Sequence, residues 1–330
     1  MKKTLTLALA SALLLSACAA PAPAPAAEAP QPPAPIKAAV LKGPTALGML
    51  PLIDAPTLTD GTPLEIEVLP APDVLVGRLA TGELDFATVP TNVAAKLFNK
   101  GQDYRLIAMN TWGSMYIIGK DPAVTTVQAL KGKTLYSTGK GTTPEILLNF
   151  VLKRAGLDPA ADLTVDAALP PAELAQLAAA GKADLALLPE PFVTLALGKN
   201  PELSVLMDLR TLYQEALGQP ETDIAQTCLV VRGDFLKERP EAAAAFLKAY
   251  EASLGAVVQD PALGGALAEK HQILQSAALA EKAIPRSGIR FQTAPEAREA
   301  VTAFLTVLLE NAPEDIGGKL PDESFFVLEN

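Results

Sequence analysis

The chain has 330 residues, a formal net charge of −10 and a hydrophobic content of 49%. This acidic balance is unfavourable for binding nucleic acid, because phosphate contacts require clustered lysine and arginine. Two cysteines and a single histidine are too few to supply a thiolate metal site, a histidine metal cluster or a disulfide framework.

Residues 1–17 have the features of a secretory signal peptide. Lys2 and Lys3 precede an apolar run at 5–15, which is shorter than the roughly 20 residues needed to cross a bilayer. The sequence Leu15-Ser16-Ala17-Cys18 resembles a bacterial lipobox, in which cleavage before the cysteine leaves a lipid-modified N-terminus. We therefore expect lipidation of Cys18; the alternative is an ordinary cleaved signal with a chance cysteine.

Residues 18–35 are expected to form a tether. Alanine and proline dominate this segment, which therefore cannot build a core. Proline at this density favours polyproline II at about 3.1 Å per residue, long enough to hold the folded part roughly 50 Å from its anchor. Together the two segments predict an extracytoplasmic protein, lipid-anchored to the membrane of the cell envelope.

Residues 36–330 are long enough for two lobes. The sequence predicts early strands and helices in alternation, a pattern that favours a mostly parallel α/β sheet. The strands are expected at 37–41, 64–69, 85–89 and 104–109, and the helices at 45–53 and 74–80. Extended segments at 115–118 and 228–231 are interpreted as two crossings between lobes, which divide the chain into 36–114 plus 229–330 and 115–228.

The second lobe is expected to repeat this alternation. Its strands are predicted at 134–136, 163–167, 185–188 and 204–209, with a helix at 144–155. Later helices at 240–258, 262–271 and 295–309 are expected to brace the first lobe, and the interruption at 284–288 to return to the cleft. Cys228, within a strand-like run, is interpreted as a buried filler.

One helix-turn-strand unit occurs twice, which predicts two similar lobes. Its strand is Asp85-Phe86-Ala87-Thr88-Val89-Pro90 in one copy and Asp184-Leu185-Ala186-Leu187-Leu188-Pro189 in the other, each after a helical run that ends at glycine. In each copy the proline stops the strand where the next helix begins. Strand ends that open onto helix starts are where open α/β sheets bind ligands.

A glycine-rich loop is the strongest candidate site. Gly139, Lys140, Gly141, Thr142 and Thr143 precede a helix that begins near Pro144. Glycine allows close backbone approach, and the exposed N–H groups of a helix start suit a carboxylate, sulfonate, phosphate or nitrate. The alternative is a plain capped turn.

Weaker candidates follow other strand ends. Gly43 and Thr45 form the matching loop of the first lobe, and Thr91 and Asn92 follow Pro90, where a capping role is equally expected. Glu190 can accept a hydrogen bond from a ligand amine or amide, or lie solvated at a helix start.

Asn110 and Trp112 lie next to the proposed hinge. The Trp112 ring can stack on a ligand ring or cation, or belong to the core. The sole histidine, His271, has charged neighbours and is expected to be solvated, so no nucleophile system or metal site is specified.

These residues resemble the solute-binding lipoproteins of ABC importers, in the group of nitrate, sulfonate, taurine and thiamine-pyrimidine binders. The likeness covers about residues 36–330 and lies in these motifs: Leu41-Lys42-Gly43-Pro44, Gly82-Glu83-Leu84-Asp85, Pro90-Thr91-Asn92, Leu130-Lys131-Gly132-Lys133, the glycine-rich loop, Leu188-Pro189-Glu190-Pro191-Phe192 and Gly317-Gly318-Lys319-Leu320-Pro321. It implies a two-lobed type II periplasmic-binding fold with two hinge crossings, at Gly113 and around Gln226, that close on a small solute.

The resemblance also implies partners, and the chain's departures from the enzymes on this fold count against a catalytic role. A permease and an ATPase would recognise the closed form, and the protein is expected to be a monomer without cofactor or metal. Enzymes on this fold include a pyrimidine synthase with a cysteine-rich motif, which this chain lacks, so we expect no catalysis; the alternatives are a secreted enzyme and a structural lipoprotein. The ligand class stays open between an oxyanion and a nitrogen heterocycle, and Arg78, Arg105 and Arg286 are unplaced.

Overall fold

The computed structural model describes residues 33–70, 72–138 and 142–328, and Pro33–Asn330 form one compact unit. The predicted signal peptide, Cys18 and most of the tether lie outside the described residues, as do Gly139, Lys140 and Gly141. At the end of the tether, the Arg239 guanidinium donates hydrogen bonds to the carbonyls of Ala34 (2.7 Å) and Pro35 (3.3 Å). Among the described helices, none is long and apolar enough to cross a membrane.

The first lobe is built on a six-stranded sheet with the order β11-β4-β10-β3-β1-β2. Strands β1, β2 and β3 are parallel, whereas β10 runs antiparallel to both β3 and β4, and β11 antiparallel to β4. The bounds are β1 (Ile36–Leu41), β2 (Leu64–Leu69), β3 (Phe86–Pro90), β4 (Tyr104–Trp112), β10 (Ala225–Arg232) and β11 (Ile289–Thr293).

The second lobe is built on a five-stranded sheet with the order β7-β6-β8-β5-β9. Strands β7, β6 and β8 are parallel, and β5 runs antiparallel to β8 and β9. The bounds are β5 (Met115–Gly119), β6 (Thr134–Thr138), β7 (Thr164–Leu169), β8 (Leu185–Pro189) and β9 (Ser204–Asp208). This order matches β2-β1-β3-β10-β4 of the first sheet strand for strand, and the predicted α/β fold with two similar, mostly parallel sheets is confirmed.

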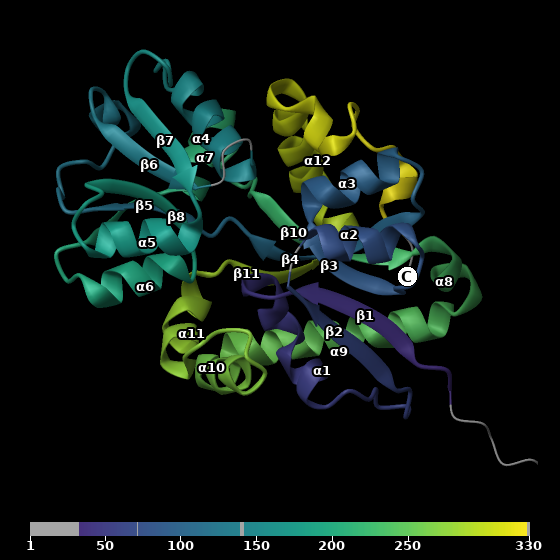
Figure 1. Ribbon diagram of the computed structural model, residues 1–330. Helices are drawn as coiled ribbons and strands as arrows, with labels where there is room; N and C mark the ends of the chain where they lie inside the picture. Colours follow the sequence, from purple (N-terminus) through teal and green to yellow (C-terminus); the bar gives the residue numbers. More distant parts are fainter. Residues whose placement is uncertain (1–32, 71, 139–141, 329–330) are drawn as a thin grey trace, which may run out of the picture. The chain divides into compact units, whose positions relative to one another are not determined.

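Helices cover both faces of each sheet (Figure 1). Central strands such as β3 and β8 are therefore buried on both sides. On the first sheet, α1 and α9 pack on one face and α2, α3 and α12 on the other; on the second, α5 and α6 oppose α4 and α7. The α-helical bounds are α1 (Leu50–Asp54), α2 (Pro72–Ala80), α3 (Thr91–Asn99), α4 (Thr143–Arg154), α5 (Pro171–Ala179), α6 (Phe192–Lys199), α7 (Leu209–Leu217), α8 (Gly233–Glu238), α9 (Pro240–Gln259), α10 (Pro261–Lys270), α11 (Ala277–Ala283) and α12 (Ala294–Asn311). The helix expected at 45–53 is a 3₁₀ segment, η1 (Pro44–Met49), followed by α1.

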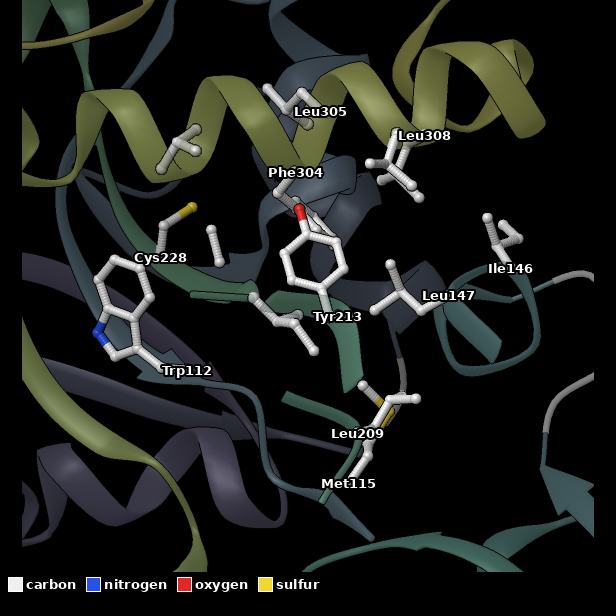
Figure 2. Close-up of a cluster of buried hydrophobic side chains, with 14 of the residues drawn as sticks. Trp112, Met115, Ile146, Leu147, Leu209, Tyr213, Cys228, Phe304, Leu305 and Leu308 are labelled. Atoms are coloured by element: carbon white, nitrogen blue, oxygen red, sulfur yellow. The ribbon is translucent and has the colours of Figure 1, made fainter. Parts of the chain in front are cut away.

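One hydrophobic core is shared by the two lobes. Figure 2 shows Ile146 and Leu147 of α4 and Tyr213 of α7 facing Phe304 and Leu308 of α12, which packs on the first sheet. All of these side chains are buried. The lobes are therefore joined by apolar packing as well as by the covalent crossings.

The two crossings lie side by side. The chain leaves the first sheet through Gly113 and returns before β10, and the Gly113 amide donates to the Ile224 carbonyl at 3.0 Å. The Ser114 hydroxyl donates to the Gln226 side-chain oxygen at 3.2 Å. Strand β10 pairs with β4 from Ala225 onward, so the return crossing precedes the 228/229 boundary expected from the sequence. The buried residues 227–231 lie in the middle of β10, so they do not mark the point at which the chain returns to the first sheet.

Candidate functional site

A cavity of about 440 Å³ lies where strand ends of both lobes meet. It is lined by Pro44, Thr45, Pro72, Pro90, Asn92, Val93, Met115, Thr142, Thr143, Pro144, Pro189, Glu190, Phe192, Gln226, Thr227 and Asp315. These residues lie at or after the carboxyl ends of β1, β2, β3, β6 and β8, at the starts of β5 and β10, or in the C-terminal segment. The cavity is thus assembled from segments far apart in the sequence.

The two repeat ends meet at this cavity. Pro90 ends β3 and is the residue before α3, while Pro189 ends β8 and is separated from α6 by Glu190 and Pro191. Proline has no N–H to donate to a sheet, so it stops the strand there and directs the chain into a helix. Because both prolines line the cavity, the duplicated unit indeed provides two of its edges.

Five predicted site residues line the cavity: Thr45, Asn92, Thr142, Thr143 and Glu190. Each lies at or just before a helix start, where backbone N–H groups have no partner within the helix. Thr142 has the extended backbone of an N-cap residue before α4. The helix starts of both lobes therefore bring hydroxyl, amide and helix N-terminal groups to the cavity, although the Thr45 hydroxyl already donates to the Leu41 carbonyl at 2.9 Å.

Gly43 lines a neighbouring cavity instead. That cavity has a volume of about 450 Å³ and includes Lys42, Gln176 and Leu195. It shares Pro44 and Phe192 with the first.

Three further predicted residues do not line the cavity. Thr91 is completely buried, and Asn110, also buried, donates to the Tyr250 hydroxyl at 2.8 Å and accepts from the Thr227 hydroxyl. The indole N–H of Trp112 donates to the Arg290 carbonyl at 3.0 Å. Figure 2 shows its ring beside Cys228, in the shared core. Burial and satisfied polar groups thus give Asn110 and Trp112 structural positions rather than positions facing a ligand.

Glu190 is neutralised by an ion pair that connects the lobes. Its fully buried carboxylate accepts from the Thr194 amide and hydroxyl, each at 3.0 Å, and from Arg286 Nε at 2.6 Å. Arg286 also donates to the Thr194 hydroxyl at 2.7 Å. The prediction that 284–288 returns to the cleft is therefore confirmed.

Several other lining residues were not predicted from the sequence as ligand-binding residues. Met115 begins β5, Gln226 and Thr227 lie near the start of β10, and Asp315 belongs to the 3₁₀ segment η4 (Pro313–Ile316). Burial raises the pKa of Asp315, the neighbouring Glu314 adds to this effect, and Lys96 opposes it. No local sequence pattern distinguishes Asp315 from other surface acids, because its place at the cavity depends on the packing of η4 against α3.

The reactive side chains lie away from the cavity. Burial raises the pKa of the Cys228 thiol to about 12, which suppresses the nucleophilic thiolate. His271 contacts Asp54 at 2.8 Å, outside the cavity lining. Within the described residues, no group of three or more His, Cys, Asp or Glu is placed to hold a metal ion. The cavity residues are suited to hydrogen bonding and to enclosing an apolar body.

Comparison with known proteins places the chain in a family. The family model described as NMT1/THI5-like matches residues 64–263. A crystal structure of an ABC transporter protein from Parabacteroides distasonis is 33% identical, with a TM-score of 0.77 and coverage of 88% of this chain and 98% of that one. No curated protein sequence matches this chain.

More distant structures share the fold. The periplasmic aliphatic sulphonate-binding protein SsuA from Escherichia coli is 18% identical, with a TM-score of 0.68 and coverage of 88% of this chain and 93% of that one. The periplasmic nitrate-binding protein NrtA from Synechocystis is 16% identical, with a TM-score of 0.59 and coverage of 88% and 86%. The chain therefore belongs to the NMT1/THI5-like family and has the two-lobed fold of the periplasmic solute-binding proteins.

Proposed function

We propose that this protein is the lipid-anchored solute-binding component of an ABC importer. The observation that carries the proposal is the cavity lined by strand ends and helix starts of both lobes. The relatives support it, because SsuA and NrtA are named as binders of aliphatic sulphonates and nitrate. In this proposal a separate permease and ATPase receive the solute, and Cys18 carries the anchor.

The cavity lining supports binding of a small polar solute with an apolar body. Thr45, Asn92 and Thr143 provide hydrogen-bonding groups at helix starts, and Val93 and Phe192 provide apolar surface. Such a lining can hold the acceptor atoms of either an oxyanion or a nitrogen heterocycle at helix N-termini.

Binding is proposed to close the lobes about the paired crossings. The crossings are linked by the Gly113 and Ser114 hydrogen bonds, so a change in dihedral angles there rotates one sheet relative to the other. The shared core between α4, α7 and α12 limits this motion to one that preserves its packing.

Mass spectrometry of small molecules released from natively purified protein tests the proposal. Val93→Trp adds bulk inside the cavity, and Val74→Trp adds the same bulk at an exposed position of α2. We expect the wild-type protein and V74W to release the same solute and V93W to release at least tenfold less. Equal release from V93W, or turnover of the solute by the purified protein, would contradict the proposal.

The anchor is tested separately by cell fractionation. We expect the wild-type chain to sediment with the cell-envelope membrane and to carry a lipid mass on Cys18. The Cys18→Ser variant should lose both properties. Recovery of the unmodified wild-type chain from the soluble fraction would contradict lipidation.

A further inference from the structure

Asp315 presents a carboxylate at the edge of the ligand cavity. It belongs to η4, which packs against α3, the helix whose second and third residues, Asn92 and Val93, also line the cavity. Asp315 is half-buried. Its side chain is therefore partly removed from water at a position that a bound solute can reach.

The Asp315 carboxylate has no hydrogen-bond donor and no ion-pair partner among the described residues. Within the described part of the chain, neither a hydrogen bond nor an ion pair engages its oxygens, and only its backbone amide is bonded, to the Ala312 carbonyl at 3.0 Å. Burial raises its pKa, Glu314 reinforces the rise, and Lys96 acts in the opposite direction without forming an ion pair. A half-buried carboxylate that has no hydrogen-bond partner is stabilised when a ligand donates a hydrogen bond to it.

The other charges of the described lining do not supply that donor. Glu190 is the second acid, and its carboxylate is already paired with Arg286 and Thr194. Among the described lining residues there is no lysine or arginine, and the rest are neutral polar or apolar. The described lining thus has a negative side, at Asp315, opposite in sign to the helix starts.

We propose that Asp315 determines ligand specificity by receiving a cationic or N–H-bearing nitrogen of the solute. The helix starts of α3 and α4 then receive acceptor atoms of the same solute, and the apolar lining encloses its body. A simple oxyanion such as a nitrate or an alkanesulfonate is disfavoured, because it would face an unpaired carboxylate. This inference rests on the proposed function and selects between its two ligand classes.

Calorimetric titration with three probes of similar size tests the inference. Benzylamine, benzyl alcohol and benzoate share one ring and differ in the charge of their substituent. We expect benzylamine to bind the wild-type protein about tenfold more tightly than benzoate, the size of effect typical of a charged hydrogen bond. In Asp315→Asn the preference should fall to about threefold or less. Glu314→Gln removes a neighbouring charge outside the lining and should retain the preference.

Four results would overturn the inference. They are tighter binding of benzoate than of benzylamine, an unchanged preference for benzylamine in D315N, an equal loss of that preference in E314Q, and failure of all three probes to bind. Thermal unfolding of both variants checks that they fold, and Asp315→Ser provides a second neutral side chain. Release of a nitrogen-free anion from native protein leaves the proposed function intact and refutes only the role of Asp315, whereas absence of any released or bound solute contradicts both.

Discussion

Removing the Arg286 side chain is expected to destabilise the contact between the lobes. The side chain of Glu190 is completely buried, whereas that of Arg286 is 39% exposed. In Arg286→Ala the buried carboxylate keeps the two hydrogen bonds from Thr194 and loses its only ion pair among the described residues. The variant therefore contains a buried charge without a counterion.

The magnitude follows from burial. Breaking a fully buried pair by removing one partner costs about 3–5 kcal/mol. Water reaches the guanidinium side of this pair, and Glu190 keeps its hydrogen bonds, so we expect a loss of about 2 kcal/mol in the free energy of unfolding. Arg298, which pairs with the exposed Glu323, is the matched control, and Arg298→Ala should cost less than about 1 kcal/mol.

Equilibrium urea unfolding measures both effects, and Glu190→Gln completes a double-mutant cycle. We expect R286A to cost clearly more than R298A, and the E190Q/R286A double variant to be more stable than the sum of the single losses indicates, by about 1–2 kcal/mol. Equal losses in R286A and R298A, together with no coupling between Glu190 and Arg286, would refute this reasoning.

Three further changes test the contact between Gly288 and Trp112, the shared core and the buried thiol. A Cβ added in Gly288→Ala would lie 1.9 Å from the Trp112 carbonyl oxygen, at a φ of +63°, so we expect thermal unfolding at least about 5 °C lower; an unchanged midpoint would contradict this contact. Phe304→Ala removes a buried ring between the lobes and should cost about 3–5 kcal/mol in urea unfolding, and a loss below about 1 kcal/mol would show that the shared core is not formed. In a Cys18→Ser background, Cys228 should react with Ellman's reagent only after denaturation, because burial raises its pKa to about 12; rapid reaction of the native protein would contradict its burial.

The fold was largely predictable because its strands are short apolar runs bounded by turns. The strand predicted at 64–69 is β2, and the duplicated unit correctly indicated two similar sheets. The expected 228/229 boundary falls inside β10, which begins three residues earlier and includes the polar residue Gln226. The side-chain oxygen of Gln226 accepts a hydrogen bond from the Ser114 amide, a contact that a linear pattern cannot show.

The site was less predictable because it is assembled by topology. Asn110 and Trp112 lie on β4, which continues three residues beyond the predicted strand end and buries both side chains. Glu190 lies at the cavity, as the motif suggested, but its pairing with Arg286 required the return of 284–288 to the second lobe. Asp315 is 125 residues beyond Glu190, and its position depends on η4 packing against α3.

A crystal structure of natively purified protein with its retained solute tests the central claim most directly. The account predicts difference density for the solute in the cavity between Pro90 and Pro189, within hydrogen-bonding distance of Asn92 or Thr143. Solute density elsewhere, such as the groove of about 720 Å³ along α12, with the inter-lobe cavity holding only water, would contradict it.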